Sequence, residues 1–335
     1  MTIKDLSTMT GYSVGTISRV LNNQPNVSEK ARKAILEAAK VCGFQPNTNA
    51  KQLKQAHSNT ILVVVKGTSN ELFRMLVETI QSQVEETAYA LVVDYLDEDD
   101  NEVLKALQLC REKKPLGILF LGGNNQNFLA DFHKIPVPCV LVTNDASALP
   151  FDNLSSVCSN NREAARLAVN HLAELGHRKI AVIGGDRAVS DTTQQRYQGC
   201  LDAFREHEIP FDRDLDYETV RYSFAGGYRA AKNLLGKQRE FTAIFAMADV
   251  MAIGAIRALR EEGKRVPEDV SVVGFDGITI GQFMVPTLAT VTQPVGKIGR
   301  RSVEILRQQI EAQGTCCHET VPVILEWRES ARKQA

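Results

Sequence analysis

The chain lacks the features that mark membrane proteins, disulfide-bonded secreted domains and metal sites. No apolar run among its 335 residues is long enough to cross a bilayer, and no apolar signal segment opens it. Its seven cysteines are an odd number, and none forms a CxxC or Cys/His cluster with metal-ligand spacing. We therefore expect free thiols in a reducing cytoplasm, with no metal, no cofactor and no membrane partner.

Motifs of the common catalytic folds are also missing. The chain has no G-x-S-x-G nucleophile elbow, no Walker loop and no G-x-G-x-x-G after a strand pattern. His171, His177 and His207 have no partnered nucleophile visible in the sequence. An enzyme is therefore the weaker hypothesis, and a binding or regulatory function the stronger one.

Charge is almost balanced overall but unevenly distributed along the chain. The first 57 residues hold eight Lys or Arg and three Asp or Glu, a net charge of +5, whereas the whole chain carries −1 and the remainder therefore −6. A small basic segment ahead of an acidic body favours a polyanionic partner for that segment.

The first 45 residues have the pattern of three short helices. Apolar residues recur at helical spacing from Ile3 to Met9, and Gly11 permits the left-handed backbone that ends a helix. Ser13 can cap a second helix and Ser28 a third. Two short helices joined by a glycine-containing turn and supported by a third form a helix-turn-helix; the alternative is a generic three-helix bundle with a solvated polar face.

The second helix is expected to expose short polar side chains beside an arginine. Such side chains suit phosphates and base edges, and a guanidinium can pair bidentately with guanine. The outward positions are Gly15, Thr16, Ser18, Arg19 and Asn22. This pattern predicts binding to double-stranded DNA.

The stretch TIKDLSTMTGYSVGTISRVLNN, followed by VSEKARKAILEAAKVCGFQPN, resembles the DNA-binding head of the LacI/GalR family of bacterial transcription regulators. The resemblance implies that Val14, Gly15 and Arg19 occupy base-reading positions. It implies that Thr16, Ser18 and Asn22 contact phosphate or support the helix. Gly15 departs from the family pattern, because that position more often carries a side chain, so one base contact is expected to be absent.

Residues 46–59 form a polar stretch that is too short to hold a helix alone in water, so a flexible linker is one interpretation. The resemblance implies instead a hinge helix that folds on DNA and pairs with its twin from a second subunit. In that helix Asn47 is the cap, Leu53 the wedge in the minor groove, and Ala50 packs beside it. Paired hinges require a homodimer and a near-palindromic operator.

From residue 60 onward, short runs of Val, Ile and Leu alternate with helical patterns, which predicts parallel sheets covered on both faces. The predicted strands are 60–65, 89–96, 116–122 and 138–143 in a first set, and 179–185, 217–222, 243–247 and 270–277 in a second. Two such lobes in series would enclose a cleft at the carboxyl ends of the strands, where ligands bind in this class of sheet.

The body resembles the sugar-binding, periplasmic-type sensor of the same family, in LGHRKIAVIGG (175–185), ADVMAIGAIRAL (248–259), VPEDVSVVGFDG (266–277) and PTLATVTQP (286–294). The expected fold is an N-terminal all-α helix-turn-helix head (1–45), a hinge helix and linker (46–59), and an α/β body (60–335) of two doubly wound parallel-sheet lobes. The resemblance implies three crossings between the lobes, which we place near Asn160, Ala289 and Pro322. Lobe one would then hold about 60–160 and 290–321, and lobe two about 161–289 and 322–335.

Two charged residues follow predicted strands where the cleft is expected. A guanidinium from Arg196 and a carboxylate from Asp276 could grip vicinal hydroxyls through charge-assisted hydrogen bonds. The resemblance implies that both contact the effector, together with Phe73, Asn144, Asp145, Thr192 and Tyr222. It implies a small-molecule effector, a sugar or sugar derivative.

Each assignment has a structural alternative. Arg196 and Asp276 could pair with each other, Tyr222 could be ordinary packing, and Asp145 a turn residue. Asp249 is interpreted as a helix N-cap instead of a ligand contact. Two departures from the family, Ala248 and Asn160, each remove polar or negative character near the expected cleft.

The sequence thus predicts a ligand-controlled repressor that acts as a homodimer, since no heptad segment for a tetramer is present. The alternative is the same DNA-binding regulator with a body that responds to a protein partner. An extracytoplasmic binding protein is disfavoured by the basic head and the absent signal segment.

Overall fold

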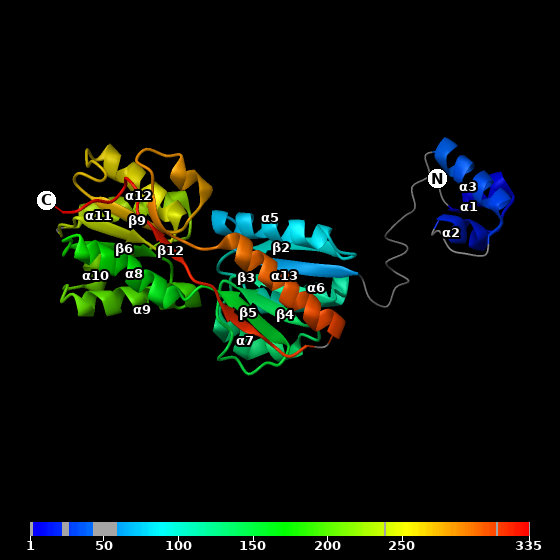
Figure 1. The fold of residues 1–335 in the computed structure, drawn as a ribbon, viewed down its shortest axis with the longest axis horizontal. Helices are drawn as coiled ribbons and strands as arrows, with labels where there is room; N and C mark the ends of the chain where they lie inside the picture. Colours follow the sequence, from blue (N-terminus) through cyan, green and yellow to red (C-terminus); the bar gives the residue numbers. More distant parts are fainter. Residues whose placement is uncertain (1–2, 22–26, 43–58, 238, 313, 335) are drawn as a thin grey trace. The chain divides into compact units, whose positions relative to one another are not determined.

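The computed structural model describes residues 3–21, 27–42, 59–237, 239–312 and 314–334, drawn in colour in Figure 1. They fall into two compact units, residues 1–58 and residues 59–335. Four predicted DNA-contacting residues, Asn22, Asn47, Ala50 and Leu53, lie outside the described residues. The predicted hinge helix is therefore not tested by the structure.

The N-terminal unit contains α1 (Ile3–Thr10), α2 (Val14–Leu21) and α3 (Glu29–Val41). The Oγ atom of Ser28 accepts a hydrogen bond from the backbone of Ala31 at 3.3 Å, and Ser13 caps α2 in the same way. Gly11, between α1 and α2, has a φ of +70°. Leu6, Ile17 and Ile35, one from each helix, are fully buried and form the core of this unit. The predicted helix-turn-helix is confirmed by these local features.

The body contains two six-stranded sheets within the described residues, with the orders β11-β5-β4-β3-β1-β2 and β12-β10-β9-β8-β6-β7. The first sheet consists of β1 (Thr60–Lys66), β2 (Ala90–Leu96), β3 (Gly117–Leu121), β4 (Cys139–Val142), β5 (Leu154–Cys158) and β11 (His318–Thr320). The second consists of β6 (Ile180–Gly184), β7 (Tyr217–Thr219), β8 (Ala243–Ala246), β9 (Ser271–Asp276), β10 (Ala289–Thr292) and β12 (Ile324–Glu326). Within the described residues, neighbouring strands of both sheets pair in parallel, apart from β10 with β12, which are antiparallel.

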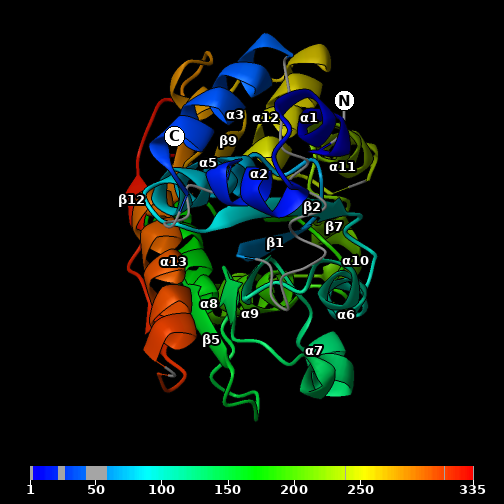
Figure 2. The same cartoon turned by 90° about the vertical axis from the view of Figure 1, so that its right-hand side faces the viewer.

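Helices cover both faces of each sheet, as Figures 1 and 2 show. The first sheet packs against α5 (Glu71–Glu85) and α13 (Val295–Ala312) on one face, and against α6 (Glu102–Lys113) and α7 (Asn125–Asp131) on the other. The second packs against α8 (Asn161–Glu174) and α9 (Asp191–Glu206) on one face, and α11 (Phe224–Gly236) and α12 (Asp249–Glu261) on the other. The short helices are η1 (Phe132–Lys134), α10 (Arg213–Asp216) and η2 (Thr279–Gln282). The predicted fold class is confirmed.

The second crossing between the lobes follows strand β10. Strand β10 pairs with β9 and β12 of the second sheet, and Val291 is fully buried in the core of that lobe. Residues 290–292 therefore lie in the second sheet, and the chain leaves that sheet at Gln293, close to the predicted crossing near Ala289. The first and third crossings fall between β5 and α8 and between β11 and β12.

Within the described segments, no helix combines the length and the hydropathy of a bilayer-spanning helix.

Candidate functional site

Helix α2 presents one apolar and one polar face. Ile17 and Val20 are buried against the other helices, whereas Val14, Gly15 and Arg19 are exposed. Thr16 and Ser18 are half-buried, and the hydroxyl of Thr16 lies 2.9 Å from that of Ser13. A side chain at Gly15 would meet only Ser13 within 4 Å. The helix therefore exposes a guanidinium beside short side chains, as base reading in a major groove requires.

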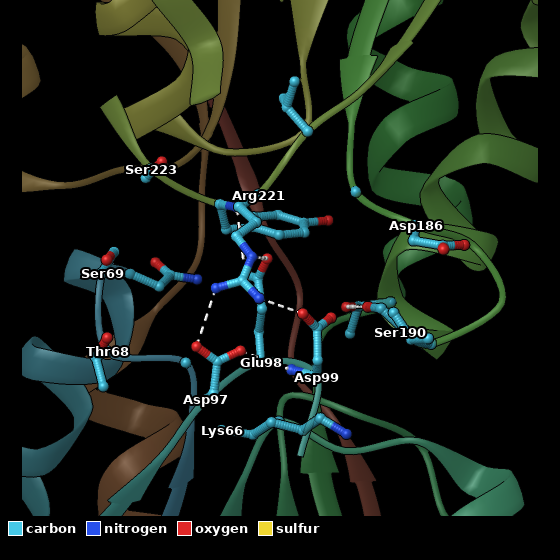
Figure 3. A pocket seen from close by; sticks show the side chains of 18 of the residues that line it. Lys66, Thr68, Ser69, Asp97, Glu98, Asp99, Asp186, Ser190, Arg221 and Ser223 are labelled. Atoms are coloured by element: carbon cyan, nitrogen blue, oxygen red, sulfur yellow. Dashed lines mark hydrogen bonds and ion pairs between the residues drawn. The ribbon is translucent and has the colours of Figure 1, made fainter. Parts of the chain in front are cut away.

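A cavity of about 810 Å³ lies between the two lobes of the body, and part of it is shown in Figure 3. Lobe one lines it with segments that follow β1, β2, β3 and β4, and lobe two with segments that follow β6 and β7. The carboxyl ends of parallel strands from both sheets therefore open onto one space, which is where ligands bind in doubly wound folds. The volume lies within the range of about 300–1,000 Å³ that is typical of small-molecule sites.

Four of the seven predicted effector residues line this cavity: Phe73, Thr192, Arg196 and Tyr222. The other three do not. Asn144 is buried and its amide donates to the carbonyl of Gly123 at 3.0 Å, which supports the cavity wall. Asp145 is exposed and accepts the backbone N–H of Ser147 at 2.9 Å, which is the geometry of a turn residue.

Arg196 reaches the cavity from the first turns of α9 but is only 4% exposed. Its Nε donates to Oδ1 of Asn161 at 2.9 Å, and Nη1 donates to the carbonyl of Met247. Nη2 lies 3.9 Å from Oδ1 of Asp276, and the guanidinium stacks on the ring of Phe275 at 3.7 Å from its centroid. Arg196 and Asp276 therefore do pair, at the outer limit of an ion pair.

Asp276 ends β9 with one carboxylate oxygen unpartnered. Oδ1 accepts from the side-chain amide of Gln293 at 2.9 Å, while Oδ2 is buried without a hydrogen-bond partner among the described residues. Burial raises the pKa of Asp276 to about 7, although the positive charge of Arg196 acts to lower it. Its φ of 124° is a strained backbone conformation for a non-glycine residue, of the kind that clusters at functional sites. Gln293 lies at the crossing between the lobes, so Asp276 contacts the connection directly.

The interpretation of Asp249 as a helix N-cap is wrong. The cap position of α12 is Ala248, which makes no side-chain cap bond. The fully buried carboxylate of Asp249 instead accepts hydrogen bonds from the N–H groups of Gly277 and Ile278 and from the hydroxyl of Thr290, at 2.6–2.8 Å. Asp249 therefore ties α12 to the segment that follows β9 and to β10. Burial raises its pKa to about 6.

Tyr222 combines packing with a place in the cavity wall. Its hydroxyl lies 2.6 Å from that of Thr193, and its backbone N–H is 3.4 Å from a carboxylate oxygen of Glu98 in the other lobe.

Of the two departures from the family pattern, Ala248 is fully buried outside the cavity lining. Asn160 caps α8 by accepting from the N–H of Glu163 at 3.1 Å.

A set of ion pairs that was not predicted from the sequence bridges the two lobes. Arg221, after β7, reaches the acidic segment after β2 (Figure 3): Nη1 is 2.9 Å from Asp97, Nε is 3.4 Å from Glu98, and Nη2 contacts Asp99. A second bridge joins the N–H of Asn125 to the carboxylate of Asp191. The run of acids at 97–100 was the available signal, but nothing local indicates its partner.

The two buried carboxylates predict how stability depends on pH. The pKa values of Asp249 and Asp276 are about 6 and about 7 in the folded chain, above the ordinary 3.8, so the folded state holds these protons more tightly. Their stabilising contribution is present below the ordinary pKa and is lost as pH rises through the folded values. We expect the temperature of the unfolding midpoint to decrease as the pH rises from about 4 to about 7, and to decrease less in Asp276→Asn.

Thermal unfolding of both proteins across this range measures the effect. Burial lowers the pKa of His177, which acts in the opposite direction, so the difference between wild type and variant is the quantity to follow. Parallel curves for the two proteins would contradict the assignment to Asp276.

Comparison with known proteins agrees with this architecture. Residues 2–47 match the model for bacterial regulatory proteins of the lacI family, and residues 169–331 match a periplasmic binding protein-like domain. The HTH-type transcriptional regulator MalR of Clostridium butyricum is 35% identical, over 98% of this chain and 99% of its own.

Solved structures match over the same extent. The lac repressor dimer bound to operator and the anti-inducer ONPF superimposes with a TM-score of 0.82 at 26% identity, covering 99% of both chains. The complex of the transcriptional regulator CelR with cellobiose superimposes with a TM-score of 0.72 at 26% identity, covering 99% of this chain and 100% of the other. These proteins are regulators, which confirms the prediction of a regulator instead of an enzyme. A basic three-helix unit, a two-lobed body with a cavity between its sheets and a relative matched almost end to end together show that this chain belongs to the LacI family of bacterial transcription regulators.

Proposed function

We propose that the chain is a repressor that binds a near-palindromic operator as a homodimer and is controlled by a sugar-like effector bound between its lobes. The observation that carries the proposal is the cavity of about 810 Å³ that both lobes line, on the same chain as an exposed recognition helix. Two relatives support it, since one was solved with operator and an anti-inducer and the other with cellobiose.

The cavity suits a polyhydroxylated ring. Phe73 and Tyr222 offer aromatic surface for the apolar face of a ring, and Thr192 and Ser190 offer hydroxyls. The guanidinium of Arg196 also lines the space. A ligand held by groups of both lobes would bind some angles between the lobes better than others, and it would shift their populations by that difference in affinity.

Control of DNA binding follows from thermodynamic linkage. If one arrangement of the lobes favours operator binding, an effector that prefers the other arrangement weakens operator binding, and operator weakens effector binding by the same factor. Gln293, which joins β10 to α13 and binds Asp276, lies on a connection that such a movement must change. The predicted hinge at 46–59 would carry the change to the head.

A thermal-shift screen of the purified chain against sugars, sugar derivatives and nucleosides tests the proposal. A ligand present at about a hundred times its Kd stabilises the fold by about 2.7 kcal/mol, which is a clear shift of the midpoint. We expect the same compound to change the affinity for operator, measured by fluorescence anisotropy of labelled DNA. Stabilisation without any change in operator affinity would contradict control by this site. A response to no small molecule would favour the protein-partner alternative.

A further inference from the structure

The charges around the cavity indicate which effectors it admits, given the effector site proposed above. The inner cations, Lys66 and Arg196, already have partners within the fold. Lys66 lines the cavity, but its Nζ lies 2.6 Å from the carboxylate of Glu102, and the two side chains are only 8% and 0% exposed. Glu102 also accepts from Asn124 and Asn127, at 2.6 and 3.0 Å, so the pair is held in place. Lys66 therefore offers little net charge to an anion.

Arg196 is committed in a similar way. Each of its three nitrogens faces a protein acceptor: Asn161, the carbonyl of Met247 and, more distantly, Asp276. The ring of Phe275 covers one face of the guanidinium. A phosphate or carboxylate is best held by an arginine whose N–H groups are free to face it in parallel, whereas two of the three nitrogens of Arg196 already donate to the protein.

The mouth of the cavity carries excess negative charge. Among the residues that the structure describes, Arg221 is the one cation that pairs with Asp97, Glu98 and Asp99. The remaining lining carboxylate, Asp186, forms no ion pair with a described residue. Among the lining cations, Lys232 already pairs with Glu262, so its charge is partly balanced within the fold. Arg229 lines the cavity without an ion pair among the described residues. The four lining carboxylates, Asp97, Glu98, Asp99 and Asp186, therefore outnumber Arg221 and Arg229, the two lining guanidiniums at the mouth.

From this arrangement we infer that the Asp97–Asp99 carboxylates, bridged by Arg221, form a charge filter at the mouth of the cavity. The filter admits uncharged polyols and excludes phosphorylated and acidic sugars. An anion that enters the cavity is repelled by the excess negative charge and meets inner cations that already bind protein groups, so it loses hydration without gaining a fully free cation. An uncharged polyol meets no such repulsion and retains the aromatic rings and hydroxyls of the wall.

The test compares matched ligands on the full-length protein by isothermal titration calorimetry. Glucose, ribose and cellobiose are each titrated beside the corresponding terminal phosphate ester and uronic or aldonic acid. We expect binding only by uncharged members. Equal or tighter binding by a charged member would overturn the filter and leave the proposed effector site standing. Binding by no member of any set would contradict the proposed sugar effector, and the filter would fall with it.

Variants make the test independent of which sugar binds. Asp97→Asn combined with Asp99→Asn removes two charges from the mouth. The readout is the affinity for the phosphate ester divided by the affinity for its uncharged counterpart. A general weakening of the ion pairs between the lobes would change both affinities together and leave this ratio unchanged. We expect the phosphate ester to gain about tenfold over its uncharged counterpart at low salt, and the gain to shrink at high salt.

Glu240→Gln is the matched control, since Glu240 is exposed, pairs with Lys179 and lies outside the cavity lining. The control should leave the ratio unchanged. An unchanged ratio in the double variant, or an equal gain in the control, would show that Asp97 and Asp99 do not select by charge.

Discussion

Arg196→Ala is expected to abolish the effector's influence on operator binding while operator binding itself persists. The substitution removes the contacts to Asn161 and to the carbonyl of Met247, and it leaves the buried carboxylate of Asp276 without its cation. Removing one partner of a buried pair typically costs about 3–5 kcal/mol of stability. Because the pKa of Asp276 is already raised to about 7, its protonation should keep the cost toward the lower end near neutral pH.

Anisotropy titrations of labelled operator, with and without effector, measure the response, and thermal unfolding measures the stability. Arg196→Lys keeps a positive charge but lacks the guanidinium fork, so it should fold better than the alanine variant and still lose the response. Arg257→Ala serves as a control because Arg257 is exposed on α12, away from the cavity. A full effector response in both Arg196 variants would show that the effector binds elsewhere.

Arg19→Ala is expected to remove most of the discrimination between operator and unrelated DNA. Arg19 is exposed on α2, where Ile17 and Val20 anchor the opposite face. A bidentate arginine–guanine contact is worth about 1–3 kcal/mol of discrimination, which is roughly 5- to 150-fold for each half-site. Because two half-sites are read by a dimer, the total effect on the operator should be larger. Binding to unrelated DNA should weaken much less, since it depends on phosphate contacts.

The measurement is the ratio of the two dissociation constants at one salt concentration, with circular dichroism to confirm the fold. Lys33→Ala, an exposed lysine on α3, provides a control that removes positive charge from a different helix of the same unit. Its ratio should stay close to that of the wild type. If Arg19→Ala retained the wild-type ratio, α2 would not be the helix that reads the bases.

Several features were predictable because their causes are local in the chain. The N-caps of α2 and α3, the left-handed Gly11 and the helical spacing of apolar residues placed the three helices of the head. Continuous apolar runs of Val, Ile, Leu and Phe placed strands such as β1 and β3, since a strand buried on both faces must be apolar throughout. The resemblance to the family predicted four residues that line the cavity: Phe73, Thr192, Arg196 and Tyr222.

Short strands were not predictable from the same signals. Strand β5 contains two serines, and β11 has only three residues. Such segments lack an apolar run, and their pairing with neighbours in the sheet makes them strands. The exact position of the second crossing between the lobes also depends on strand pairing. Only the hydrogen-bonded pairing of β10 with β9 shows that residues 290–292 lie in the sheet of lobe two.

The sequence by itself determined the helices of the head, the alternation of strands and helices in the body, and the family. These properties depend on residues close together in the chain or on whole-chain pattern. Only the tertiary structure decided that Asp249 binds the segment after β9, that Lys66 is neutralised by Glu102, and that Arg221 joins the acids after β2. Each of these pairs is separated by many residues. The charge that a cavity presents depends on which groups the fold has already paired, and that pairing is a property of three-dimensional contacts that no local pattern encodes.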